Sequence, residues 1–106
     1  MELIETPVFT RQVVERLSDE EYRQLQLYLV LRPDAGPVIP RSGGLRKLRW
    51  RLSGRGKRGG ARVIYYWMGS ATRLCLLFLY PKNVRSDLRP EELRVLRSLV
   101  AAEKES

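Results

Sequence analysis

Apolar residues recur at helical spacing in three parts of the chain. Thr6-Pro7 is typical of an N-cap followed by the first residue of a helix, and Ser18 to Glu21 has the pattern of a capping box at the start of a second helix. Pro90-Glu91-Glu92 indicates the start of a third helix. The apolar positions that we expect to be buried are Phe9, Val13, Val14 and Leu17 in the first helix, Tyr22, Leu25, Tyr28, Leu29 and Leu31 in the second, and Leu93, Leu96, Leu99 and Val100 in the third.

Strand patterns fill most of the remaining chain. Residues 1–6 and 45–52 alternate apolar with polar positions, and a further strand is expected at 61–68, with one face buried in each. Residues 74–80 are almost continuously apolar, which predicts a central strand covered on both faces. The order strand, two helices, three strands, helix predicts one α+β domain over residues 1–106, with a small antiparallel-dominated sheet. Prolines and glycines between the second helix and the second strand predict a loop that passes to the other side of that domain.

Charge is distributed very unevenly along the chain. No acidic residue occurs between Asp34 and Asp87, and this acid-free segment holds twelve of the twenty Lys and Arg residues. The segment carries +12, whereas the rest of the chain carries −4. Such segregation indicates a surface that faces a polyanion, and nucleic acid is the favoured partner. An anionic membrane is the weaker alternative, because no stretch approaches the roughly 20 apolar residues of a spanning helix.

Composition excludes several other classes of site. The chain has one cysteine and no histidine, so neither a disulfide framework nor a zinc site is expected, and no cofactor is implied. Cys75 lies in the continuously apolar run, where a buried core thiol is expected. The N-terminus opens with acidic residues and lacks the basic and then apolar order of a signal peptide, so the cytoplasm is the expected compartment.

Candidate binding residues are concentrated in the acid-free segment. Lys47, Arg49 and Arg51 share one face of the strand expected at 45–52. Their spacing of about 6.6 Å is similar to the phosphate repeat of a nucleic acid strand, although a merely solvated strand face has the same pattern. The glycine-rich stretch that follows lacks the Lys-Ser/Thr pair of a phosphate loop and predicts a mobile basic hairpin loop. Its cations are Arg55, Lys57 and Arg58.

Residues 43–88 resemble the RelE superfamily of toxin-antitoxin ribonucleases, and specifically its HigB-like branch. No single motif is specific, but their combination is, and the order of the expected elements extends the similarity over nearly the whole chain. The motifs are Gly43-Gly44-Leu45-Arg46-Lys47, then Gly56-Lys57-Arg58-Gly59-Gly60 leading into Arg62-Val63-Ile64-Tyr65-Tyr66, and then Leu79-Tyr80-Pro81-Lys82-Asn83 with Ser86-Asp87-Leu88.

The resemblance implies a compact microbial-ribonuclease-like fold and cleavage of mRNA, typically in the ribosomal decoding site. By motif, Arg62 takes the position of the family's arginine at the start of the strand after the basic loop. Lys47 and Arg49 take the positions of its basic pair, and Lys82 that of its lysine after the central strand. The chain departs from better-studied members at Asn83, where they have an arginine, and at Arg89, where they have a tyrosine. The implied partners are the ribosome, mRNA and a HigA-like antitoxin that also binds DNA.

Cleavage of RNA through its 2′-OH needs a proton acceptor, a proton donor and stabilisation of phosphorane charge, here without histidine. Arginine grips phosphate bidentately and stays charged, so Arg62 is the candidate for charge stabilisation. Lysines in a cationic cluster can lose a proton more readily, so Lys82, Lys57 and Lys47 are candidates for proton transfer, without a metal. Tyr66 and Tyr80 are hydroxyl donors or base-stacking platforms, or simply sheet residues. Asn83 completes the expected RNA-binding set.

Two other functions fit parts of this pattern. A non-enzymatic nucleic-acid-binding module would use the same cations only to hold phosphates, with binding that falls steeply with salt and no cleavage. A ParE-like member of the same superfamily would inhibit DNA gyrase by contact and would need no catalytic cations, which the cluster at Lys47, Arg49, Lys57, Arg62 and Lys82 disfavours.

Overall fold

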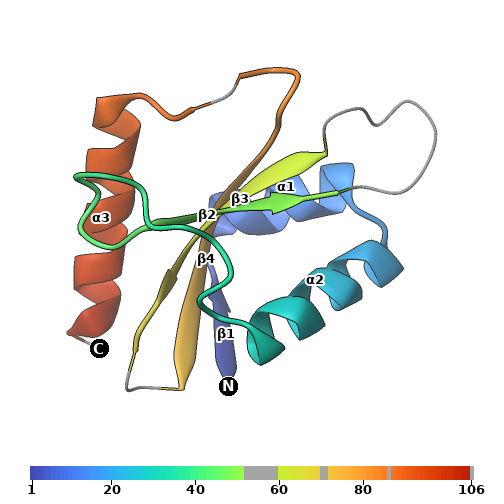
Figure 1. Ribbon diagram of the computed structural model, residues 1–106, viewed down its shortest axis with the longest axis horizontal. Helices are drawn as coiled ribbons and strands as arrows, with labels where there is room; N and C mark the ends of the chain where they lie inside the picture. The colour runs from blue at the N-terminus through green and yellow to red at the C-terminus, as the bar shows by residue number, and fades with distance from the viewer. Residues whose placement is uncertain (52–59, 70–71, 86, 106) are drawn as a thin grey trace.

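Four strands form one mixed sheet in the order β1-β4-β3-β2. The computed structural model describes residues 1–51, 60–69, 72–85 and 87–105. Within them the order of elements is the one that the sequence predicts (Figure 1). The elements are β1 (Glu2–Glu5), α1 (Pro7–Arg16), α2 (Asp19–Leu31), β2 (Arg46–Trp50), β3 (Ala61–Trp67), β4 (Arg73–Pro81) and α3 (Pro90–Lys104).

The predicted α+β class and the antiparallel-dominated sheet are confirmed. β1 pairs with β4 in parallel, and β3 pairs with β4 and β2 in antiparallel fashion. The continuously apolar β4 lies between β1 and β3 as the predicted central strand. Cys75, at 3% exposure, is the buried core thiol that its surroundings indicate.

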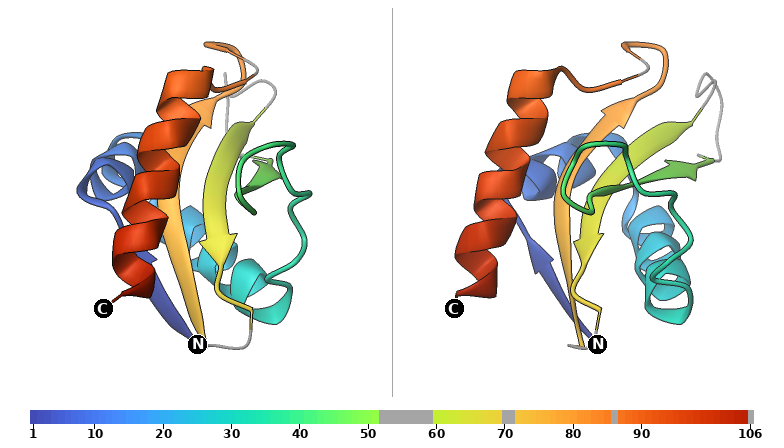
Figure 2. Two further views of the ribbon diagram at one scale, coloured as in Figure 1. Left: turned by 90° about the vertical axis from the view of Figure 1, so that its left-hand side faces the viewer. Right: turned by 60° about the vertical axis from the view of Figure 1, so that its left-hand side comes forward.

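Helices cover both faces of the sheet. Figure 2 shows α3 running along one face, whereas α1 and α2 lie on the other. The core on the α1 and α2 side contains Phe9, Val13, Leu17, Leu25, Leu29, Leu48, Val63, Tyr65, Leu74, Leu76 and Leu79. The core on the α3 side contains Leu45, Ile64, Cys75, Leu77, Tyr80, Leu96 and Val100. This division assigns each side chain of the sheet to one face.

The helix starts follow the capping signals in the sequence. The Thr6 hydroxyl accepts from the Phe9 N–H at 3.0 Å. The Ser18 hydroxyl accepts from the Glu21 N–H at 3.1 Å, and the Glu21 carboxylate accepts from the Ser18 N–H at 2.9 Å. These contacts satisfy backbone donors that the first turn of a helix leaves without partners.

Three positions expected in the core are exposed instead. Val14 is 76% exposed, Leu31 71% and Leu99 44%. Each of these residues lies on a helix that packs against only one face of the sheet. The side of the helix that becomes buried is therefore narrower than the side on which apolar residues occur. The expected strand at 45–52 is also too long: β2 ends at Trp50, which leaves Arg51 beyond the strand. Within the described residues, no helix is long and apolar enough to cross a membrane.

The loop between α2 and β2 crosses to the α3 side, as predicted, and Tyr65 anchors its start. The Tyr65 hydroxyl accepts from the Gly36 N–H and donates to the Pro33 carbonyl, both at 2.8 Å. Further along the loop, Ile39 packs into the core beneath α3. The loop therefore links the two layers and fixes the start of β2.

Candidate nucleic-acid interface

A row of three polar side chains crosses the sheet near the end of β4. Arg49 of β2 lies opposite Arg62 of β3, and Arg62 lies opposite Tyr80 of β4. Directly opposed residues of antiparallel strands project to the same face, here the α3 side. Lys47 lies on the same face two residues before Arg49. The fold thus brings together four of the residues that the sequence singles out.

A β-bulge in β4 places Tyr80 in this row. The register between β3 and β4 shifts between Ile64 and Tyr65, so that Ile64 opposes Phe78 whereas Tyr65 opposes Leu76. Consequently Leu77 and Phe78 both pack toward α3, and Tyr80 follows on that side. Strict alternation from Leu76 would have turned Tyr80 toward α1 and α2. Bulges commonly redirect a side chain beside a functional site.

Arg62 is almost completely buried, with 6% of its surface exposed. Its guanidinium donates a long hydrogen bond of 3.4 Å to the Ala61 carbonyl. The positive charge of Arg62 also lowers the pKa of Asp87 and opposes the rise in the pKa of Tyr80, so it acts on both groups. A buried guanidinium is desolvated and held in place, which strengthens its interaction with an incoming phosphate.

Lys47 forms an ion pair with Asp87, a contact that sequence reasoning missed. The Lys47 ammonium donates to Oδ1 of Asp87 at 2.6 Å, and the two side chains are 28% and 73% exposed. This hydrogen bond, together with the positive charge of Lys47, lowers the pKa of Asp87. In this arrangement Lys47 is a hydrogen-bond donor. In the sequence, Asp87 ends the acid-free segment and belongs to the motif Ser86-Asp87-Leu88, but neither feature predicts its contact with Lys47.

Tyr80 is 3% exposed and packs in the α3-side core. Burial raises the pKa of its hydroxyl, and the negative charge of Asp87 raises it further, whereas Arg62 and Arg85 act in the opposite direction. A tyrosine with a raised pKa keeps its proton at neutral pH. Tyr80 is therefore suited to donate a proton or hydrogen bond and unsuited to accept a proton as a phenolate.

Arg85 is a second residue that sequence reasoning missed. Its guanidinium carbon lies 5.6 Å from the centre of the Phe78 ring and 5.4 Å from that of Tyr80. Glu92 at the start of α3 binds the same guanidinium at 2.7 Å. These three contacts hold Arg85 beside the row, and they depend on the bulge that turns both rings to one face.

The other candidates lie at different places. Arg51 is exposed just beyond β2, and Lys82 and Asn83 are exposed in the turn after β4. The Lys82 N–H donates to the Gly60 carbonyl at 3.2 Å, which joins that turn to the start of β3. Tyr66 is four residues from Arg62, about 13 Å along β3, and the ammonium of Lys104 lies 4.7 Å from its ring centre. Tyr66 therefore does not join the row.

The candidates of the basic loop, Arg55, Lys57 and Arg58, lie outside the described residues.

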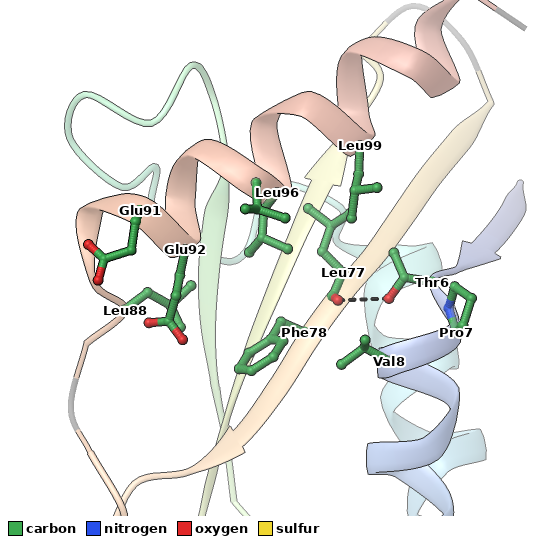
Figure 3. A pocket seen from close by; sticks show the side chains of 11 residues that line it. Thr6, Pro7, Val8, Leu77, Phe78, Leu88, Glu91, Glu92, Leu96 and Leu99 are labelled. Atoms are coloured by element: carbon green, nitrogen blue, oxygen red, sulfur yellow. Dashed lines mark hydrogen bonds between the residues drawn. The ribbon is translucent and has the colours of Figure 1, made fainter.

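Two cavities border this part of the molecule. One, of about 640 Å³, lies between α1 and the segment after β4, and Tyr80, Arg85 and Asp87 are among its lining residues. The other, of about 440 Å³, is an apolar groove between the start of α1 and α3 (Figure 3). Leu77 and Phe78 of β4, Val8 of α1, and Leu96 and Leu99 of α3 line this groove.

No protein-family model matches this chain.

Proposed function

We propose that this chain is a HigB-like toxin of the RelE superfamily, a ribosome-dependent endoribonuclease that cleaves mRNA through attack of the 2′-OH and so inhibits translation. The observation that carries the proposal is the buried Arg62, held between Arg49 and Tyr80 on one face of the sheet. A desolvated arginine beside an exposed arginine and a protonated tyrosine hydroxyl suits a phosphate that gains charge during reaction.

Each residue of the row has a role in this mechanism. Arg62 and Arg49 bind the non-bridging oxygens of the scissile phosphate and stabilise the dianionic phosphorane. The Tyr80 hydroxyl donates a proton to the leaving 5′ oxygen. Lys82 and Lys57 are the candidate acceptors of the 2′-OH proton, since Lys47 donates to Asp87. The ribosome supplies the in-line orientation of the 2′-OH, an effect worth roughly 7 to 11 kcal/mol at best.

Mapping the 5′ ends of cellular mRNA after brief induction tests this proposal. Wild-type protein should produce cuts inside coding regions that respect the reading frame, and Arg62→Met should not. Growth arrest without new 5′ ends, combined with salt-dependent binding to ribosomes, would favour the non-enzymatic binding module. DNA damage in place of translation arrest would favour a gyrase inhibitor.

A toxin of this kind needs a co-expressed antitoxin. An acidic segment of that partner would be attracted to the basic face, whereas an apolar helix or strand would fit the groove between α1 and α3. Two variants separate these modes after co-purification with the product of the neighbouring reading frame. Charge reversal at Arg55, Lys57 and Arg58 should slow association in the first mode, and Leu99→Glu, which places a charge at the groove, should speed dissociation in the second. Unchanged binding by both variants would exclude both surfaces.

A further inference from the structure

The cavity of about 640 Å³ between α1 and the segment after β4 adjoins the proposed cleavage site. Tyr80 and Asp87 line the cavity, and both also belong to the cluster around Arg62 and Lys47. A nucleic acid strand whose phosphate lies on Arg62 would therefore bring a neighbouring base to the mouth of this cavity. The proposed roles of the cations do not use the space.

Arg85 offers a stacking surface inside the cavity. The rings of Phe78 and Tyr80 and the carboxylate of Glu92 hold its planar guanidinium, whose side chain remains 29% exposed. Unstacked RNA bases are bound by stacking on aromatic rings or on arginine planes. An arginine that is already immobilised loses little conformational freedom when a base stacks on it.

Gln12 of α1 offers hydrogen-bond donors in the same cavity. Its Oε1 accepts from the backbone N–H of Leu79 at 2.7 Å, which assigns the oxygen and nitrogen of the amide. Within the described residues the Gln12 amide nitrogen has no hydrogen-bond partner, and neither does the carboxylate of Glu15, which also lines the cavity. A donor and an acceptor that the protein does not use thus line the same cavity, and the Watson–Crick edge of every base presents acceptors beside donors.

The mixed lining favours a base over a bare anion. Arg16, Arg85 and Arg89 contribute positive charge, but Glu15 and Asp87 contribute negative charge to the same walls. Carboxylates repel phosphate, whereas a neutral base tolerates both signs and uses both for hydrogen bonds. The cavity also has apolar walls at Leu79, Pro81 and Val84.

We propose that this cavity is a base pocket that binds one unstacked nucleobase of the mRNA next to the scissile phosphate. Arg85 stacks on the base, and Gln12 and Glu15 bind its edge. The proposal rests on the proposed function, because it assigns part of the same substrate to a second set of residues. It makes the base beside the cut a determinant of where cleavage occurs.

Two variants test the pocket with little change to the fold. Gln12→Glu keeps the oxygen that the Leu79 N–H needs and removes the donors, and Arg85→Lys keeps the charge near Glu92 and removes the planar surface. Arg23→Gln is the control for Gln12→Glu, because it also changes the net charge by −1, on an exposed α2 side chain whose partner is Glu20. Thermal unfolding checks that each variant is folded.

The binding probe is an RNA trinucleotide with a 2′-deoxyribose at the attacking position, which prevents cleavage, and a matched trinucleotide that lacks the base beside that position. Gln12→Glu and Arg85→Lys should each weaken binding of the intact probe about tenfold, the scale of a lost base contact. They should leave binding of the abasic probe at the wild-type level. Equal losses with both probes, or affinities equal to that of Arg23→Gln, would overturn the base pocket.

The same variants in the 5′-end mapping experiment separate the two proposals. Frame-respecting cuts with an altered base preference in Gln12→Glu support both the nuclease and the pocket. Cuts with an unchanged base preference overturn the pocket and leave the nuclease standing. A third outcome is that the wild type makes no cuts, but binds the trinucleotide in a base-dependent way that Gln12→Glu weakens. This outcome overturns the nuclease and supports the pocket.

Discussion

Replacement of Arg62 by methionine separates the charge of this side chain from its packing. Arg62 is 6% exposed, so its methylene groups contribute to the sheet surface beneath the guanidinium. Methionine retains an unbranched side chain of similar length and removes the charge and the hydrogen-bond donors. Alanine removes the stem as well, so the two variants share the loss of charge and differ in packing.

Stability and activity should respond differently to the two changes. Arg62 lies directly opposite Arg49, and like charges in that position destabilise a strand pair by roughly 0.2 to 1 kcal/mol. Arg62→Met removes this repulsion together with the attraction between Arg62 and Asp87, so its stability should be close to that of the wild type. Arg62→Ala loses two buried methylene groups, about 2 kcal/mol, which lowers the Tm by roughly 10 °C. Both variants should lose about 100-fold to 1,000-fold in cleavage rate, the scale of removing one charge-stabilising donor.

The assay is single-turnover cleavage of mRNA on programmed ribosomes with saturating protein, alongside thermal unfolding of each variant. Saturation ensures that the rate reports the cleavage step and not binding. A folded Arg62→Met protein that cleaves within threefold of the wild type would remove Arg62 from the site and would refute the mechanism that we derive from the row.

Three further outcomes are expected. Arg49→Ala should reduce the dependence of ribosome or RNA binding on salt, as the slope of log affinity against log salt concentration, by about one. Lys47→Ala should reduce this slope by less, because Asp87 already neutralises Lys47. If neither variant changes the slope, this face of β2 is merely solvated. Tyr65→Phe should lower the free energy of unfolding by about 1 to 3 kcal/mol, measured in urea, since the Gly36 N–H and the Pro33 carbonyl both lose a partner. The ion pair of Asp87 lowers the pKa of this carboxyl in the folded state, so it stabilises the fold above the unfolded pKa and ceases to do so as pH falls through the lower folded pKa. The Tm of Asp87→Asn should therefore be lower than that of the wild type at neutral pH, and the difference between the two Tm values should shrink on acidification. A difference that stays constant with pH would contradict this.

Local signals in the sequence predicted most of the fold because they act over a few residues. Thr6 and Ser18 bind backbone groups three residues away, so their helix starts could be read directly. The central position of β4 followed from composition, since only a strand covered on both faces is apolar throughout. Val14 and Leu31 were misassigned because helical spacing identifies an apolar side but not how much of it the sheet covers.

The candidate site was only partly predictable because its geometry depends on the bulge in β4. The pairing of Arg62 with Tyr80 requires the register shift after Ile64, and nothing in the run 74–80 marks where that shift occurs. Arg85 is held by two rings that the same shift turns to one face. Gln12 belongs to the site only because α1 lies against the edge of β4 beyond the end of β1. These are tertiary contacts, which the spacing of apolar residues along the chain does not predict.

The distribution of charge in the folded molecule differs from its distribution along the chain. The acid-free segment excludes carboxylates from its sequence, yet the fold brings Asp87 back to Lys47, and Glu92 to Arg85. Three cations of the segment, Lys47, Arg73 and Arg85, therefore already have an acidic partner in the free protein. Arg62 lies directly opposite Arg49, another cation. A phosphate that binds at Lys47 must displace or share a carboxylate, and one that binds between Arg49 and Arg62 offsets the repulsion between these two cations. Arg62 and Arg49 should hold the scissile phosphate for this reason, with Lys47 and Arg85 positioning the nucleotides on either side.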